Sequence, residues 1–222
     1  DWKLPANHLW QICYEPSFNC ALEQRIGPSG EGGKWVCDPW KIAAQVAAGK
    51  KCLIYSIGSE GDYGFEIGMQ QAVSGSCEIH IFDREHWDQY TVRGPPGKMK
   101  YHVYTVGKPP SATPVSRLVE DLGHVGRTID IFKIDCEGCE FDSYRSWFGS
   151  GVYIRQILIE VHGDTSKQWG MQANEFFNFL LDLGYVIFHK EPNIQWSAGD
   201  AMCVEISFLK LSPSFSRGGG IL

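Results

Sequence analysis

The chain has 222 residues and a formal net charge of -6, with 43% hydrophobic and 21% charged residues. This composition is ordinary for a folded globular protein and excludes a disordered or collagen-like chain. No cluster of Lys and Arg is present, so we expect no nucleic-acid partner. The longest apolar run, residues 176–188, is interrupted by polar residues and is too short to span a bilayer. We therefore expect no membrane span in this chain, although a targeting or anchor segment could have been removed before Asp1.

Eight cysteines are many for a reduced cytosolic protein, and their spacing matches no zinc motif. Disulfide bonds formed in an oxidising compartment explain them better. This interpretation predicts a location in the secretory pathway, either in the Golgi lumen or outside the cell. The alternative is a cytoplasmic protein whose cysteines are packed in the core.

The N-terminal part, residues 1–38, is rich in Trp, Pro, Gly and Cys and is predicted to form an irregular arm or cap. Asp38 is a plausible N-cap for a helix that has Pro39 at its first position. Residues 39–211 are predicted to form one domain. Residues 212–222 are predicted to be a flexible tail.

From residue 52 onward, segments of strand and helix pattern alternate. Strands are predicted at 52–58, 78–83, 100–107, 129–135, 155–162, 185–190 and 202–211. Helices are predicted at 65–73, 115–123, 140–148 and 173–184. This alternation indicates right-handed crossovers and a mostly parallel sheet with helices on both faces. Since no helix fits between the last two strands, we predict an α/β, Rossmann-like sheet of seven strands in which the last strand is antiparallel.

Ligands of such sheets bind beyond the carboxyl ends of the strands. The first strand is followed there by a turn containing Gly58, Ser59, Glu60 and Gly61, whose spacing differs from the G-x-G-x-x-G of dinucleotide enzymes. Its glycines would let the backbone approach an adenosyl ligand, and either Glu60 or Asp62 would receive the ligand's amino group. Alternatively, it is a plain turn between a strand and a helix.

Asp83 ends the second predicted strand, about 20 residues after the glycine turn, in the way that acids of dinucleotide-binding folds do. Its carboxylate would accept hydrogen bonds from the ribose hydroxyls of a bound adenosine. The alternative is that Asp83 is the N-cap of a helix near residues 84–87.

Six polar residues lie at the ends of the fourth, fifth and sixth strands or just after them, at the same edge of the sheet: Asp135, Glu137, Glu160, His162, Glu191 and Asn193. A histidine beside carboxylates can act as a general base for a hydroxyl or can bind a divalent cation. We expect catalytic roles for Asp135, Glu137 and His162, and we expect Asp135 also to contact the adenosyl ligand. A metal would be held by Asp135, Glu160 and His162, and substrate by Glu191 and Asn193. The alternative is that these side chains only hold loops.

Six segments carry a resemblance to a known family: CLIYSIGSEGDYGFEIGM, CEIHIFD, IDIFKIDCEGCEF, IEVH, GYVIFHKEPN and MCVEISFLKL. They resemble FkbM-type methyltransferases, most closely the methyltransferase-like domain proteins of animals and other eukaryotes, over about residues 35–211. KIDCEGCE is the most specific piece and is similar to the family pattern K-[IM]-D-[IV]-E-G-x-E. Cys139 departs from that pattern, because the family usually has a small residue there. The EGDYG of the glycine turn is also unusual, and these departures leave the acceptor open.

The resemblance implies a class I methyltransferase fold, S-adenosyl-L-methionine as methyl donor, and a small hydroxyl-bearing acceptor. It also implies that Asp135 and Glu137 matter to the site, and that related chains often follow an N-terminal signal anchor. Glu140 falls at the start of a helix, where its charge suits the helix dipole without a catalytic part.

Three cysteine pairs are considered from the predicted elements. Cys52 and Cys77 begin neighbouring strands at the same level, so they are predicted to form a disulfide. In the N-terminal arm, Cys13, Cys20 and Cys37 offer one further pair, and Cys13 with Cys20 is the local candidate. Cys136 and Cys139 either pair and lock their turn or remain free thiols.

The predicted function is S-adenosylmethionine-dependent O-methylation of a small-molecule or glycan hydroxyl, assisted by a base or a divalent cation. The alternatives are an NAD-dependent oxidoreductase, which shares the doubly wound sheet, and a non-catalytic binding protein with a methyltransferase fold. An open cavity lined by the predicted catalytic residues would favour an enzyme over the non-catalytic protein.

Overall fold

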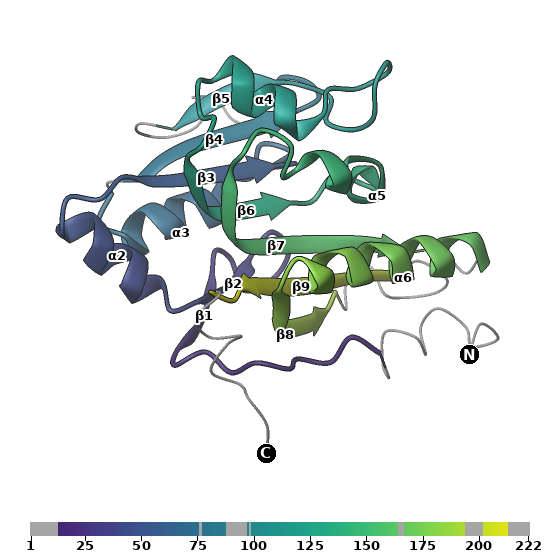
Figure 1. Ribbon diagram of the computed structural model, residues 1–222. Helices are drawn as coiled ribbons and strands as arrows, with labels where there is room; N and C mark the ends of the chain where they lie inside the picture. Colours follow the sequence, from purple (N-terminus) through teal and green to yellow (C-terminus); the bar gives the residue numbers. More distant parts are fainter. Residues whose placement is uncertain are drawn as a thin grey trace.

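The computed structural model describes residues 13–75, 77–87, 97, 99–163, 167–193 and 202–212. Its main sheet has seven strands in the order β5-β4-β3-β6-β7-β9-β8 (Figure 1). Their bounds are β3 (Cys52–Ile57), β4 (Cys77–Asp83), β5 (Lys100–Val103), β6 (Thr128–Ile134), β7 (Tyr153–Gly163), β8 (Tyr185–Pro192) and β9 (Met202–Lys210). All pairings are parallel except those of β9, which is antiparallel to both β7 and β8. The predicted sheet with a reversed last strand is confirmed.

Helices cover both faces of this sheet, as predicted. One face is covered by α4 (Val115–Asp121), α5 (Cys139–Ser143), the 3-10 helix η1 (Tyr144–Ser146) and α6 (Lys167–Asp182). The other face is covered by α2 (Pro39–Ala47) and α3 (Gly64–Ala72). In the central strand β6, Phe132 packs toward the first group of helices and Ile131 toward the second. A strand buried on both sides explains its nearly continuous apolar sequence.

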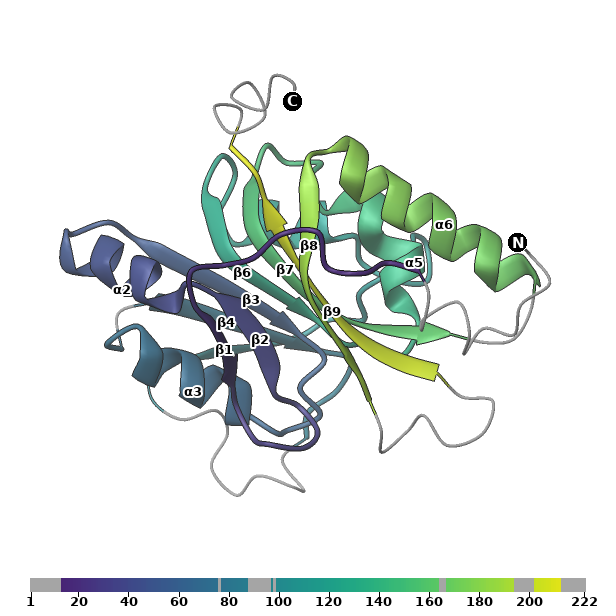
Figure 2. The same ribbon diagram turned by 90° about the horizontal axis from the view of Figure 1, so that it is seen from below.

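A two-stranded hairpin precedes the main sheet. It pairs β1 (Glu23–Ile26) antiparallel with β2 (Lys34–Cys37), so the prediction that this region is irregular is wrong. The Gln156 side chain of β7 exchanges two hydrogen bonds with the backbone of Cys37, at 2.9 and 2.8 Å. Ser207 of β9 donates to the carbonyl of Trp35 at 3.0 Å. The hairpin thus lies between α3 and β8 and covers β7 and β9 (Figure 2).

Three disulfides tie these parts together. Cys52 and Cys77 are register partners in β3 and β4 and are bonded with a Cα–Cα distance of 4.5 Å, the pair that we expected from the strand starts. Cys20 bonds with Cys37 at the end of β2, so the predicted Cys13–Cys20 pair is wrong. The hairpin explains the error, because it brings the end of β2 back to the segment before β1. The third disulfide lies in the candidate active site.

Two remaining predictions concern the ends of the chain and its hydropathy. Apart from Ser212, the predicted flexible tail lies outside the described residues, as do residues 1–12. Among the described residues, no helix combines the length and hydropathy that crossing a bilayer requires.

Candidate active site

A cavity of about 680 Å³ opens at the carboxyl ends of β3, β4, β6 and β7. The predicted site residues that line it are Gly58, Ser59, Glu60, Asp83, Asp135, Glu137, Glu160 and His162. The loop between β1 and β2 adds Glu31 and Gly32 to the wall. Gly61, Glu191 and Asn193 were also predicted, but they are not among the residues that line this cavity.

Gly58 marks the closest approach of the turn after β3 to the turn after β6. Its φ of +76° lies in the left-handed region, and a Cβ added there would come within 1.6 Å of the carbonyl oxygen of Asp135. Lys133 donates to the carbonyl of Gly58 at 2.6 Å. Only glycine fits this position, so the two turns are built against each other.

Asp83 organises the glycine turn. Its Oδ2 accepts the N–H groups of Ser59 and Glu60, both at 2.9 Å, and the Ser59 hydroxyl at 3.1 Å. Its Oδ1 accepts the N–H of Arg84 at 3.1 Å. Residues 84–87 form no helix, so the alternative N-cap role of Asp83 is not seen. The carboxylate thus holds the backbone of the turn, whatever ligand lies beside it.

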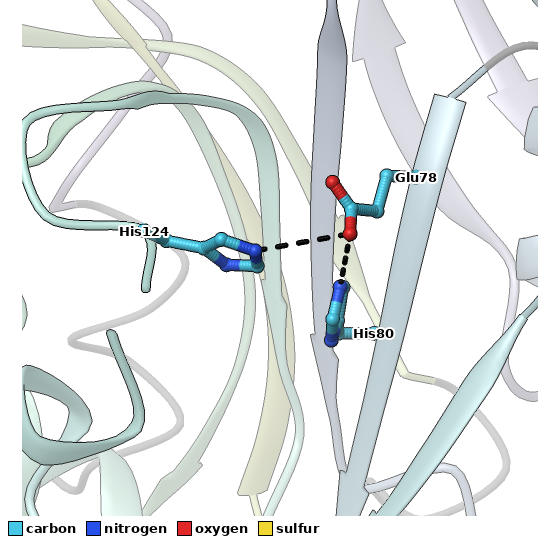
Figure 3. A group of neighbouring side chains, drawn as sticks. All are labelled: Glu78, His80 and His124. Atoms are coloured by element: carbon cyan, nitrogen blue, oxygen red, sulfur yellow. Dashed lines mark hydrogen bonds and ion pairs between the residues drawn. The ribbon is translucent and has the colours of Figure 1, made fainter. Parts of the chain in front are cut away.

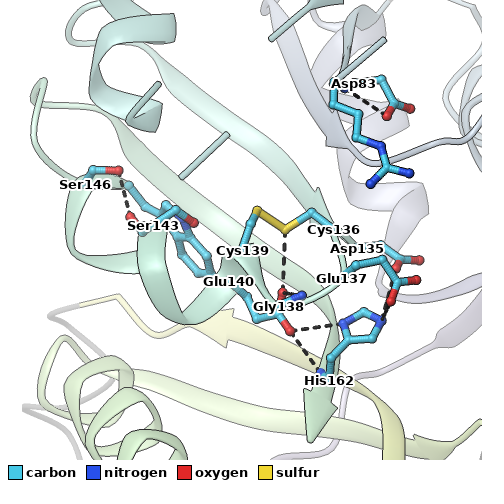
Figure 4. Close-up of a disulfide and its surroundings, with 12 residues drawn as sticks. Asp83, Asp135, Cys136, Glu137, Gly138, Cys139, Glu140, Ser143, Ser146 and His162 are labelled. Atoms are coloured by element: carbon cyan, nitrogen blue, oxygen red, sulfur yellow. Dashed lines mark hydrogen bonds and ion pairs between the residues drawn. A yellow bond between two sulfur atoms is a disulfide. The ribbon is translucent and has the colours of Figure 1, made fainter. Parts of the chain in front are cut away.

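The turn after β6 is held from inside by Glu140, which is fully buried. Its carboxylate accepts the N–H of Gly138 at 3.0 Å and that of His162 at 2.9 Å (Figure 4). Glu137 and Gly138 both adopt positive φ, and the Cys136–Cys139 disulfide spans them. From the sequence we expected Glu140 only to interact with the helix dipole, but it is the central hydrogen-bond acceptor of this turn.

Glu137 points outward from the same turn. Its side chain is 70% exposed, and its Oε2 lies 3.6 Å from Nε2 of His162. It therefore sits at the rim of the cavity.

His162 is surrounded by groups that favour its charged form. Burial lowers its pKa, but hydrogen bonds to Cys203 and Glu140 and the charges of Glu140 and Asp135 together raise the pKa to about 11. Its Nδ1 lies 3.0 Å from Glu140, and its Nε2 lies 3.9 Å from Asp135. An imidazolium has no free lone pair with which to accept a proton. This state suits a hydrogen-bond donor better than the general base that we expected from the sequence.

Lys34 of β2 enters the site from the hairpin and was not predicted. It is 1% exposed, and its Nζ lies 3.1 Å from Asp135 and 3.9 Å from Glu160 and pairs directly with Glu205. Although burial disfavours its charge, these carboxylates raise the pKa of Lys34. Burial likewise opposes ionisation of Asp135, but Lys34, Lys133 and His162 hold the pKa of that carboxyl well below its usual range.

Glu160 behaves in the opposite way. Burial and the charges of Asp135 and Glu205 raise its pKa to about 8, although Lys34 and a hydrogen bond from Asn193 act against that rise. Asn193 donates to it at 2.7 Å and orients the carboxylate. Glu160 is thus a carboxylate in the cavity lining whose pKa allows it to gain or lose a proton near pH 8.

The predicted metal ligands do not form one compact set within the described part of the chain. Ligand atoms come within 4.8 Å of one another in two other groups here, Glu31 with Asp135 and Glu160, and Glu160 with His162 and Cys203. Each group contains only two of the three predicted ligands. The Lys34 ammonium already provides positive charge to Asp135 and Glu160. The residues present therefore do not fit the metal site that we predicted.

Glu191 serves the hairpin. Its Oε2 accepts from Arg25 at 3.1 Å and from the Trp35 indole at 3.0 Å. Glu160, Glu205 and Glu191 are register neighbours across β7, β9 and β8. Such a row of like charges is unfavourable unless cations neutralise it, and β1 and β2 supply those cations.

The sheet is Rossmann-like, and its reversed seventh strand lies between the fifth and the sixth. The cavity is bounded by a glycine turn and by acidic residues at strand ends. Together these features are the architecture of a class I methyltransferase. A family model described as "Methyltransferase domain" matches residues 1–210. The chain therefore belongs to this family of methyltransferase domains. The match counts against the oxidoreductase alternative and does not separate the FkbM-type branch from others.

Solved structures with a similar chain path include M. capricolum TrmK in complex with S-adenosyl-homocysteine, at 15% identity and a TM-score of 0.45 over 76% of this chain and 67% of that chain. Another is the N-methyltransferase NodS from Bradyrhizobium japonicum WM9, at 12% identity and a TM-score of 0.44 over 78% of this chain and 94% of that chain. At such low scores, nothing about donor or acceptor follows from them. No curated protein matches the chain.

Proposed function

We propose that the protein is an S-adenosylmethionine-dependent methyltransferase that methylates a hydroxyl group of a small-molecule or glycan acceptor. The observation that carries this proposal is that Gly58, Asp83 and Asp135 meet around one cavity in a chain of the methyltransferase-domain family. Asp135, Glu137 and His162 line an open cavity, which favours an enzyme over a non-catalytic binding protein.

The glycine turn and Asp83 would hold the adenosyl part of the donor, which supplies an electrophilic methyl group on a sulfonium. The charge of the cavity suits such a cationic ligand. Burial, together with the negative charges of Glu137, Asp83 and Asp135, raises the pKa of Glu60. This shift reveals an excess of negative charge that a cation would relieve.

Glu160 is the general base in this proposal. It lines the cavity, and its pKa of about 8 allows it to accept a proton near the pH at which the enzyme works. His162, as a charged donor, orients the acceptor and Asp135. Alignment of the acceptor oxygen with the methyl group lowers the barrier by several kcal/mol more. Three disulfides support placing this reaction in the secretory pathway.

Calorimetry with S-adenosylhomocysteine tests the donor site. The intact protein should bind it, and Asp83→Ala should weaken binding by about tenfold or more, equivalent to about 1.4 kcal/mol. The control is Asp121→Ala, at the end of α4 and outside the cavity lining, which should bind as the wild type does. Absence of binding in the intact protein would refute the proposal.

A second experiment tests the base and the acceptor class. Donor turnover is measured with panels of sugars, other alcohols and amines. With an accepted alcohol, kcat/KM should rise as pH passes about 8, and Glu160→Gln should remove that rise and most of the rate. Turnover of amines alone would overturn O-methylation while leaving the donor site intact.

A further inference from the structure

A second group of ligand-type side chains lies far from the cavity. Glu78 and His80 are two residues apart on β4 and therefore face the same side of the sheet, and His124 follows α4 (Figure 3). Glu78 stands near the amino end of β4, whereas Asp83 ends it. At the rise of a strand, these two residues are about 17 Å apart. None of the three side chains lines the methyltransferase cavity.

The geometry of this group matches that of a tetrahedral metal site. Oε1 of Glu78 lies 3.1 Å from Nε2 of His80 and 3.8 Å from Nε2 of His124, and all three ligand atoms lie within 4.8 Å of one another. Around a tetrahedral zinc ion with bonds of about 2.0–2.1 Å, ligand atoms are about 3.3–3.4 Å apart. The two distances from Oε1 of Glu78 therefore lie within about half an ångström of the spacing that a tetrahedral ion requires.

Each of these side chains is also held by a partner at its other polar atom. Nδ1 of His80 lies 2.8 Å from Nε2 of His102, and Nδ1 of His124 lies 2.7 Å from the Tyr55 hydroxyl. Arg127 donates to Oε2 of Glu78 at 2.8 Å. These contacts leave Nε2 of both imidazoles facing Oε1 of the carboxylate (Figure 3). Outer-shell hydrogen bonds of this kind orient the ligands in protein metal sites.

We propose that Glu78, His80 and His124 bind one Zn²⁺ ion, with water as the fourth ligand. Two imidazole nitrogens and one carboxylate oxygen are a ligand set that zinc accepts. The histidines are 1% and 4% exposed, whereas the Glu78 side chain is 32% exposed and leaves a side open for water. The ion would tie β4 to the turn after α4.

Lys100 is the competitor of the metal. Its ammonium lies 2.9 Å from Oε1 of Glu78, where it places positive charge beside the same oxygen. The Lys100 side chain is 56% exposed, so it can swing into water at little cost when a divalent cation arrives. Replacing this lysine should therefore strengthen metal binding, which a purely structural network of hydrogen bonds does not predict.

The test uses the full chain, freed of metal with a chelator and dialysed, then titrated with zinc chloride by calorimetry and checked for bound metal by mass spectrometry. One equivalent should bind. Glu78→Gln and His124→Gln should each weaken binding by at least about 100-fold, and Tyr55→Phe by about tenfold. Lys100→Met should tighten it. Since Glu78 is partly exposed, its variant keeps the test valid if a histidine variant fails to fold.

Two control variants separate this site from other histidines. His86→Gln changes an exposed residue outside the group, and His162→Gln changes the histidine of the methyltransferase cavity. Both should retain one equivalent of zinc at wild-type affinity. Unchanged affinity in both Glu78→Gln and His124→Gln, or loss of the single equivalent in His162→Gln, would overturn the proposal. Binding of S-adenosylhomocysteine is measured separately, so this result stands apart from that of the donor site.

Discussion

Glu140 accepts the main-chain N–H of His162 at 2.9 Å and lies 3.0 Å from Nδ1 of its imidazole. One fully buried carboxylate therefore fixes both the backbone and the ring of this histidine. The contact joins the start of α5 to the end of β7, and both elements contribute residues to the lining of the cavity. Because the pair is charged, its strength depends on pH.

This dependence gives the first prediction. The folded-state pKa of His162, about 11, is above its ordinary value of 6.5, so its charged form is favoured by folding. The stabilisation is complete below pH 6.5 and is lost as the pH rises toward 11. Over that window the free energy of unfolding should fall more steeply in the wild type than in His162→Gln, by up to about 1.4 kcal/mol per pH unit.

Urea denaturation at a series of pH values from 6 to 10 measures this difference. His86→Gln, an exposed histidine, is the control and should follow the wild-type curve. Parallel curves for the wild type and His162→Gln would show that the imidazole gains no proton affinity on folding.

The second prediction concerns Lys34, whose ammonium neutralises a group of buried and half-buried carboxylates. Lys34→Met leaves Asp135, Glu160 and Glu205 without it, and should lower the free energy of unfolding by about 3–5 kcal/mol. Adding Glu205→Gln to this variant should restore part of the loss, because one like charge is removed.

Chemical denaturation of the single and double variants measures both effects. The matched control is Lys41→Met, which removes a lysine that pairs with Asp38 but is 53% exposed. It should cost about 1 kcal/mol or less. Equal losses in Lys34→Met and Lys41→Met would mean that the buried network adds no stability.

The central strands of the sheet could be predicted because they are buried on both faces. IDIFKI, for example, carries enough apolar residues to identify β6 without any knowledge of its neighbours. The hairpin could not be predicted in this way. KWVC is a strand of only four residues whose lysine is buried. Its partners Asp135 and Glu205 are 101 and 171 residues away, and no local pattern reports such contacts.

The candidate site could also be predicted only in part. Strand-end position was enough to bring Asp135, Glu160 and His162 to one cavity. It was not enough to predict which of the acids after β6 points into the protein and which points to solvent. Glu137 and Gly138 adopt left-handed conformations, which turn Glu137 out to solvent and let Glu140 point inward. The spacing of these residues in the sequence does not indicate that Glu137 points outward and Glu140 inward.

The third prediction ranks the disulfides. Cys52 and Cys77 are 25 residues apart, so replacing both with alanine should cost about 3.5 kcal/mol through the greater entropy of the unfolded chain. Cys136 and Cys139 are 3 residues apart, and their loss should cost only about 2 kcal/mol. Affinity for S-adenosylhomocysteine should fall more when Cys136 and Cys139 are replaced than when Cys52 and Cys77 are replaced, because only Cys136 and Cys139 line the cavity. Denaturation and calorimetry of the two double variants test both rankings, and a larger affinity loss without Cys52–Cys77 would contradict the role given to the turn.

The last prediction concerns Gly58, where the glycine turn and the acidic turn touch. In Gly58→Ala, the new methyl group would meet the carbonyl oxygen of Asp135 at 1.6 Å, and the residue would also hold a φ of +76°. Because backbone rather than a flexible side chain stands in the way, one of the two turns must move. We expect a loss of more than about 3 kcal/mol in stability. Wherever the variant still folds, it should show no measurable binding of S-adenosylhomocysteine.

The matched control for this variant is Gly30→Ala, in the loop between β1 and β2. An added Cβ at Gly30 meets nothing within 4 Å, and its φ is outside the left-handed region. Its thermal unfolding and its affinity for S-adenosylhomocysteine should match those of the wild type. If Gly58→Ala also matched the wild type in both measurements, the two turns would not pack as closely as the structure shows. The donor site would then need to be placed elsewhere, since the proposed site depends on that contact.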